Sequence, residues 1–287
     1  MSSDQPHVAV FGPGLMGASL LMALRAKRPG TTLSVWARRE DAAREVVRRG
    51  LADLASTDAA KAVHGADTVV LCVPVDRMEE VARAIAPHVG ADTLVTDAGS
   101  TKERLVPRLE KIFSAQGNFV GSHPMCGSEQ SGLEAARADL YEGALCVVSP
   151  TDSTRAELAD RAEAFWQSVG CRTARLSPAD HDAAAAAASH VPHIAAAALV
   201  ELAAQGPPEF RGLCASGFRD TTRIAAGSAR IWAAILTENA EKTAAALAGL
   251  ENILAGYRQA MLGGDREKIA RLLASAAENR GKIFPGT

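Results

Sequence analysis

Residues 8–17 read Val8-Ala9-Val10-Phe11-Gly12-Pro13-Gly14-Leu15-Met16-Gly17, and they place a G-x-G-x-x-G pattern between an apolar strand and a helical stretch. In this pattern Gly12 permits a tight turn, Gly14 lets a pyrophosphate approach the backbone, and Gly17 lets the helix pack closely on the strand. The free amide groups at the start of the helix would face the phosphates. We therefore predict a dinucleotide site formed by Gly12, Pro13, Gly14, Leu15, Met16 and Gly17.

The chain on both sides of this loop alternates short β-branched runs with helical patterns as far as about Arg175, which is typical of a parallel sheet with crossover helices. We expect a Rossmann-type α/β domain over residues 1–177. Its predicted strands are His7 to Phe11, Thr32 to Trp36, Thr68 to Cys72, Thr93 to Thr96, Phe119 to Gly121, Ala144 to Val148 and Arg172 to Leu176.

Strand signals end after this domain, and we expect residues 178–287 to form an all-α domain. Ser177 and Pro178 predict the start of an alanine-rich helix that runs to about Gln205, with a kink at Pro192. Residues 214–287 predict further helices, broken near Gly217, Gly227 and Gly263-Gly264. The alanine-rich helix and residues 231–254 carry more apolar surface than one small helical domain can bury, which predicts a homodimer joined through the C-terminal helices.

Composition narrows the class of partner. The 31 basic and 33 acidic residues nearly balance and form no long run, so neither nucleic acid nor a membrane surface is expected, and the partner should be a small molecule. The five cysteines lack the paired spacing of metal sites or redox motifs, so we expect reduced cysteines and no metal. The sequence shows no export signal, and we expect no apolar run of spanning length; both expectations favour the cytoplasm.

The end of the second predicted strand bears on the choice of cofactor. An acidic residue usually stands there and holds the ribose 2′-hydroxyl, but this chain has Ala37 followed by Arg38 and Arg39. Without that carboxylate, the 2′-phosphate of NADP would not be repelled, and Arg38 could bind this phosphate. NADP is therefore favoured over NAD. The alternative is that both arginines only begin a solvated helix.

Three histidines and two arginines are candidates for the chemistry. His123 follows a predicted strand, where the carboxyl ends of a parallel sheet face the ligand, and His190 and His193 share one face of the long helix. Histidine suits proton abstraction from a hydroxyl group, although a buried structural role is as compatible with spacing alone. Arg219 and Arg223, four residues apart, could clamp a carboxylate or pair with a nearby acid.

Taken together and in order, the motifs resemble the prephenate and arogenate dehydrogenases of tyrosine biosynthesis over nearly the whole chain. The motifs are the glycine loop, Cys72-Val73-Pro74-Val75, Asp97-Ala98-Gly99-Ser100-Thr101-Lys102, Gly121-Ser122-His123-Pro124-Met125, Ser189-His190-Val191-Pro192-His193, and residues 217–224 with Trp232 downstream.

The resemblance implies a role for each matching residue. His123 would accept the proton of the ring 4-hydroxyl, Ser100 would orient the hydroxyl and the nicotinamide, and Arg223 would bind a substrate carboxylate. The substrate site would also include His193, Ser128, His190 and Trp232, with Glu129, Asp182 and Arg219 in a charged network around Arg223. Val73, Pro74 and Ser100 would join the glycine loop, Ala37, Arg38 and Arg39 at the cofactor.

The resemblance also implies oxidative decarboxylation of prephenate to 4-hydroxyphenylpyruvate with hydride transfer to NAD(P). His193 completes an S-H-x-P-H pattern and favours prephenate or dual use, while arogenate and an amino-deoxy analogue of prephenate stay open. The rival functions are a β-hydroxyacid dehydrogenase or imine reductase, and a regulator that senses NADP without turnover.

Overall fold

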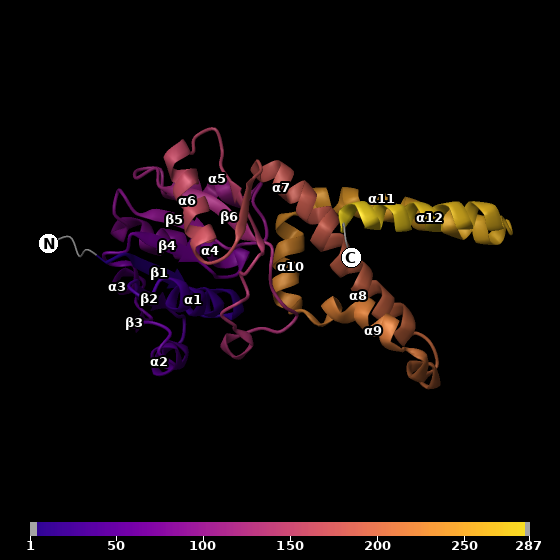
Figure 1. Cartoon of the computed structure of the whole chain (residues 1–287), viewed down its shortest axis with the longest axis horizontal. Helices are drawn as coiled ribbons and strands as arrows, with labels where there is room; N and C mark the ends of the chain where they lie inside the picture. The colour runs from indigo at the N-terminus through magenta and orange to yellow at the C-terminus, as the bar shows by residue number, and fades with distance from the viewer. Residues whose placement is uncertain (1–4, 285–287) are drawn as a thin grey trace. The chain divides into compact units, whose positions relative to one another are not determined.

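The computed structural model describes residues 5–284, in two compact units that divide after Ala240. The larger unit, up to Ala240, contains an eight-stranded sheet, the helices that cover it and four further helices, α7 to α10 (Figure 1). The smaller unit begins at Glu241 and consists of helices. This architecture confirms the expected fold class of a Rossmann-type domain followed by a helical region.

The sheet has the strand order β3-β2-β1-β4-β5-β6-β7-β8, and every pair is parallel except β6 with β7. The order reverses at β1, so the carboxyl ends of β1 and β4 border the crevice where doubly wound sheets bind ligands. The strands are β1 (His7–Phe11), β2 (Thr32–Trp36), β3 (Leu54–Ser56), β4 (Thr68–Leu71), β5 (Leu94–Asp97), β6 (Phe119–Pro124), β7 (Leu145–Ser149) and β8 (Arg172–Arg175).

Helices cover the sheet and continue beyond it. Those connecting or following strands are α1 (Leu15–Lys27), α2 (Glu40–Arg48), α3 (Ala59–Val63), α4 (Val75–Ile85), α5 (Leu105–Ile112) and α6 (Ala156–Ser168). Those after the sheet are α7 (Pro178–Ala185), α8 (Val191–Ala204), α9 (Ser216–Thr222), α10 (Ala229–Glu238), α11 (Ala240–Leu262) and α12 (Arg266–Ile283).

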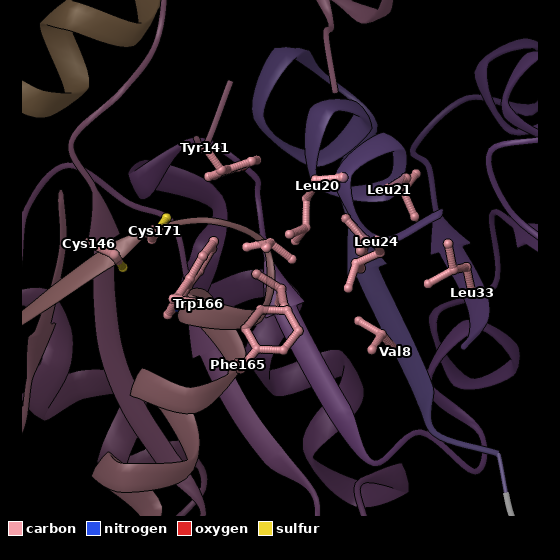
Figure 2. Packing of buried hydrophobic residues seen from close by; sticks show 14 of the residues in the cluster. Val8, Leu20, Leu21, Leu24, Leu33, Tyr141, Cys146, Phe165, Trp166 and Cys171 are labelled. Carbon is pink, nitrogen blue, oxygen red and sulfur yellow. The ribbon is translucent and has the colours of Figure 1, made fainter. Parts of the chain in front are cut away.

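Two hydrophobic clusters hold the sheet between its helices. One contains the inner faces of α1 and α6, and Figure 2 shows Leu20 and Leu24 of α1 near Val8 of β1, with Phe165 and Trp166 of α6 in the same cluster. The other is built mainly from α4 and α5 and includes Ile235 of α10. Because α10 joins this second cluster, the helices after the sheet share a core with it, which fixes one wall of the cavity described below.

The predicted strands are confirmed to within one residue at most ends, with two corrections. The short strand β3 was missed because it is only three residues long and has an exposed leucine, Leu54. Strand β7 runs antiparallel to β6, which the sequence pattern does not reveal because buried parallel and antiparallel strands can both be apolar runs. The break predicted near Gly217 is confirmed, since residues 214–215 lie outside helices directly before α9 begins at Ser216.

The long alanine-rich helix begins as predicted, because the hydroxyl of Ser177 accepts a hydrogen bond from the backbone amide of Asp180. Its irregularity lies in the turn before Pro192, where a π-helical turn, η3 (Ala186–His190), separates α7 from α8. A proline has no amide hydrogen and crowds the preceding turn, so a widened turn at this place has a clear cause.

This helix also corrects the expectation that no segment could span a membrane. By length and composition alone, residues 178–204 pass the test, with a mean hydropathy of 1.4 over 18 residues. Alanine supplies that hydropathy, and the same segment carries four buried polar side chains, which face the protein interior: His181, Asp182, His190 and His193. A core helix of a soluble protein passes the same test, so the finding is weak evidence for a membrane.

Candidate active site

A cavity of about 1010 Å³ opens along the carboxyl ends of the parallel strands. Its walls come from the loops after β1, β2, β4, β5 and β6 on one side, and from α8, α10 and the short helix η5 (Arg223–Ala226) on the other. The predicted residues on these walls are Gly12, Pro13, Gly14, Leu15, Met16, Ala37, Arg38, Arg39, Val73, Pro74, Ser100, His123, Ser128, Glu129, His193, Arg223 and Trp232.

The glycine loop has the geometry that a dinucleotide requires. Gly12 has φ +105°, and a Cβ atom there would lie 2.8 Å from the carbonyl oxygen of Cys72. A Cβ atom on Gly17 would lie 2.1 Å from the carbonyl oxygen of Gly12, so the helix can start this close to the strand only with glycine. Gly14 caps α1 without a side-chain hydrogen bond, and the first turn of α1 has no acidic residue. These features fit a bound pyrophosphate at the start of α1.

The part of the cavity expected to receive the adenosine is formed after β2. Ala37 is buried, and Arg38 and Arg39 are exposed on the cavity wall. Arg39 forms an ion pair with Asp41 at 3.3 Å, whereas Arg38 has no ion pair within the described residues. Arg38 is therefore available to an anionic ligand.

His123 lies in β6 where this strand reaches the cavity, and it is almost fully buried. Its Nδ1 atom is 2.8 Å from Nε2 of His181, a residue to which sequence analysis assigned no role. Burial, together with the nearby His181, Lys102 and His190, holds the pKa of His123 well below its usual range, so the imidazole is neutral at neutral pH. A neutral imidazole on a cavity wall can accept a proton.

A buried ion pair shapes the loop that carries Ser100. The ammonium group of Lys102 donates to the carboxylate of Asp97 at 2.7 Å, and also to the carbonyl oxygens of Gly99 at 2.8 Å and Thr101 at 3.1 Å. The loop thus folds around the cation, and Ser100 remains on the cavity wall. Lys102 belongs to one of the motifs given above, but no function was expected of it, although a lysine five residues after a strand-ending aspartate was an available signal.

Another part of the cavity wall contains Arg223 and Glu129, whose side chains form an ion pair at 2.5 Å. Glu129 has a lowered pKa because of its own backbone amide and the neighbouring guanidinium of Arg223, so it is a carboxylate at neutral pH. Ser128 lies beside it, and its hydroxyl is 3.4 Å from the Glu129 carboxylate. Arg230 also lines the cavity and has no ion pair within the described residues; sequence analysis did not single it out.

An aromatic platform forms another part of the wall. The rings of His193 and Trp232 stack with their centroids 3.6 Å apart, and Gly227 approaches the same stack, because a Cβ there would lie 2.7 Å from the indole nitrogen. His190 contacts Trp232 edge-on and accepts a hydrogen bond from Asn239, but it does not line the cavity.

The structure does not assemble the expected charged network as a whole. Glu129 contacts Arg223, but Arg219 is exposed on α9, away from the cavity wall and without an ion pair in the described part of the chain. Asp182 is buried beneath His181, where its carboxylate binds the amides of Lys102 and Glu103 rather than Arg223. Residue spacing could not separate these cases, because both residues lie in helical segments whose facing depends on tertiary packing.

Comparison with known proteins agrees with this geometry. Residues 21–175 match the model of the prephenate dehydrogenase nucleotide-binding domain, and residues 177–275 match that of the prephenate dehydrogenase dimerization domain. A cyclohexadienyl dehydrogenase of Zymomonas mobilis is 33% identical over 82% of this chain and 81% of its own. A prephenate dehydrogenase of Bacillus subtilis is 30% identical over 84% of this chain, which spans 66% of that relative's length.

A solved structure extends the likeness to three dimensions. The crystal structure of prephenate dehydrogenase from Aquifex aeolicus, in complex with hydroxyphenyl propionate and NAD+, has a TM-score of 0.91 and 30% identity, and the match covers 99% of this chain and 100% of that one. The rival functions of a β-hydroxyacid dehydrogenase and of a non-catalytic sensor are therefore set aside. The chain belongs to the prephenate dehydrogenase family, the nicotinamide-dependent dehydrogenases of tyrosine biosynthesis.

Proposed function

We propose that this chain converts prephenate to 4-hydroxyphenylpyruvate and CO2, with transfer of a hydride to a nicotinamide dinucleotide. The observation that carries the proposal is the position of His123, a neutral, buried imidazole on the wall of the same cavity that contains the glycine loop. A base beside a dinucleotide site is the combination that oxidation of an alcohol needs.

The reaction balances with the residues on the cavity wall. The bound nicotinamide supplies the acceptor for the hydride that leaves the ring carbon bearing the hydroxyl group. His123 takes the hydroxyl proton, and Ser100 orients the hydroxyl. The bond between the ring and its carboxylate then breaks, and its electron pair makes the ring aromatic as CO2 leaves and the former carbonyl oxygen becomes a phenolate. His123 returns its proton to that oxygen, which gives the phenol of the product. Positioning and a prearranged electrostatic field supply most of the rate in such a site.

Binding of the substrate is assigned to the other wall. Arg223 would bind a carboxylate of the substrate, and Glu129, with Ser128 beside it, would hold the guanidinium group of Arg223 in place. His193 and Trp232 would contact the ring and the side chain of the substrate. The proposal gives Arg219, Asp182 and His190 no direct contact with substrate, because none of the three lines the cavity.

Charge favours prephenate over arogenate. The keto side chain of prephenate leaves a dianion, whereas arogenate carries an additional ammonium group. Besides Arg223, which already has Glu129 as a partner, the cavity wall carries Arg230, which has no ion pair among residues 5–284. A second cation supports a substrate with two carboxylates and no ammonium group.

We also propose that the cofactor is NADP in preference to NAD. Support comes from Ala37, which stands where an NAD site has a carboxylate, and from the guanidinium of Arg38 on the cavity wall, which has no ion pair in the described part of the chain. The 2′-phosphate of NADP would meet no repelling carboxylate at Ala37 and would be attracted by the guanidinium of Arg38. Specificity commonly combines such a removed repulsion with an added attraction.

The remaining proposals concern assembly and location. A domain boundary between residues 177 and 178 is supported by Ser177, which caps α7 directly after the last strand. A homodimer through the C-terminal helices is supported by the match to a dimerization domain and by large exposed apolar side chains, among them Leu202 of α8 and Leu262 of α11. A cytoplasmic location is supported by the biosynthetic activity of the relatives.

The test is a cofactor-reduction assay with prephenate, arogenate and a panel of β-hydroxyacids, each with NADP and with NAD. We expect turnover with prephenate and release of one CO2 for each cofactor reduced. Turnover with a β-hydroxyacid alone, or reduction without CO2 release, would overturn the proposal.

A further inference from the structure

The carboxylate of Asp182 is a hydrogen-bond acceptor with three partners. Oδ1 accepts from the backbone amide of Lys102 at 2.7 Å and lies 2.8 Å from Nδ1 of His181, and Oδ2 accepts from the amide of Glu103 at 2.9 Å. Burial alone would raise the pKa of Asp182, but the hydrogen bonds from His181, Glu103 and Lys102 bring it below its usual value. The group is therefore an anion and can only accept hydrogen bonds.

This anion determines where the protons lie on two histidines. Because Asp182 only accepts, Nδ1 of His181 carries a hydrogen. Burial lowers the pKa of His181 although Asp182 opposes the effect, so the ring is neutral and its Nε2 is an acceptor. The partner of that Nε2 atom, Nδ1 of His123 at 2.8 Å, must then be the donor. The Nε2 atom of His123 is left with its lone pair.

We infer that His181 and Asp182 are positioning residues that hold His123 in the tautomer whose Nε2 atom is the base, and that Asp182 simultaneously fixes the loop after Ser100. The inference rests on the proposed function only in taking His123 as the base. One carboxylate thus links both proposed catalytic residues, through the ring of His181 on one side and through the amides of Lys102 and Glu103 on the other.

The surroundings of His123 explain why such a link is needed. Burial is the main cause that disfavours an imidazolium there, and the neighbouring His181 on α7, the buried ammonium group of Lys102 and His190 on η3 add to it. When Nε2 takes the substrate proton, His123 becomes a cation that still donates from Nδ1 to His181. The anion at the far end of the chain, Asp182, then stabilises that charge without taking the proton, as an orienting carboxylate does in a hydrolase triad.

The tautomer can be measured without substrate. In enzyme labelled with 15N-histidine, the His123 signals are assigned by their absence from the His123→Asn variant, and the 15N shifts report which ring nitrogen is protonated. We expect a hydrogen on Nδ1 and none on Nε2 in the wild type, and a loss of that preference in Asp182→Asn. A wild-type His123 protonated on Nε2 would overturn the inference, even if the enzyme oxidises prephenate as proposed.

Kinetics give the second readout. We expect Asp182→Asn to lower kcat by about 30-fold or more, in the range of lost orientation of a catalytic histidine, with KM and the cofactor Kd changed by less than about threefold. Asp180→Asn, an exposed acid on the same helix, is the matched control and should keep wild-type kcat. Equal kcat in the two variants would refute the role of Asp182.

Two variants of His181 separate positioning from packing. The amide oxygen of His181→Gln can still accept from Nδ1 of His123, whereas His181→Phe fills the space without an acceptor. We expect His181→Gln to retain at least about tenfold more kcat than His181→Phe, with similar Tm values. If the two variants have the same kcat, His181 only fills space and the inference is wrong.

Discussion

Replacing Ala37 by Asp and Arg38 by Ile should turn the cofactor preference from NADP towards NAD. Ala37 is buried at the end of β2, where a carboxylate would meet the ribose hydroxyls and repel a 2′-phosphate. Arg38 follows on the cavity wall and has no ion pair within the described chain that would have to break when a phosphate binds.

The magnitude follows from the exposure of Arg38. A charge-assisted hydrogen bond in a protected site contributes about 1.5 to 3 kcal/mol, but solvent screens an exposed side chain, so about 1 to 2 kcal/mol is a reasonable expectation. That free energy corresponds to about fivefold to thirtyfold in kcat/KM for NADP over NAD. Removing the Arg38 side chain alone should abolish most of this factor, and the further change Ala37→Asp should reverse it.

The assay is kcat/KM for each cofactor at saturating prephenate and at two ionic strengths, since a screened contact weakens with added salt. Arg44→Ile is the matched control, because Arg44 is an exposed arginine of α2 that does not line the cavity. Equal kcat/KM for the two cofactors in the wild type, or the same change in Arg44→Ile as in Arg38→Ile, would show that Arg38 does not read the 2′-phosphate.

Three further predictions test other parts of the site. His123→Ala should lower kcat by about two to four orders of magnitude while the cofactor Kd stays within about threefold, and near wild-type turnover would refute its role as the base. Arg223→Ala should raise KM for prephenate by at least about tenfold, as expected for a lost charge-assisted clamp, whereas Arg219→Ala should not; the reverse result would move the clamp to Arg219. Acid should destabilise the fold, because burial lowers the pKa of His190 to about 4 in the folded protein. As the pH falls, the unfolded chain therefore protonates at His190 before the folded chain does. The contribution of the neutral His190 to the free energy of unfolding is complete above about pH 6.5 and is lost progressively towards pH 4. A Tm that does not decrease between pH 7 and pH 5, or that decreases equally in His190→Gln, would contradict the assignment to this residue.

The cofactor end could be predicted from the sequence because its requirements are local. Gly17 must be glycine because a Cβ atom there would meet the carbonyl oxygen of Gly12, five residues earlier, and Gly12 is favoured as glycine by its φ of +105°. Both requirements arise within the strand–turn–helix unit, so a short motif contains the information, whereas the contact between Gly12 and the carbonyl oxygen of Cys72 joins distant residues.

The substrate end could be predicted only in part because it is assembled from distant segments. His181 is adjacent in sequence to Asp182, but its contact with His123 joins residues 58 positions apart. No sequence pattern in either segment predicts this contact. Asp182 was expected near Arg223 and instead binds backbone amides 79 and 80 residues away. Helical spacing tells which residues share a face, but the packing partner of that face is a tertiary property.

The π-helical turn at Ala186–His190 sets the angular phase between the two ends of the long helix. A π-turn accommodates one residue more than a regular turn, and one residue corresponds to a rotation of about 100° and a rise of about 1.5 Å. Upstream of the turn, Asp182 points to the buried loop; downstream, His193 lines the cavity. The six consecutive alanines at 183–188 have identical side chains, so deletion of one would change no chemical group and only the rotation of everything that follows. The alanine run therefore works as a spacer, and its length rather than its composition directs His193 to the cavity wall.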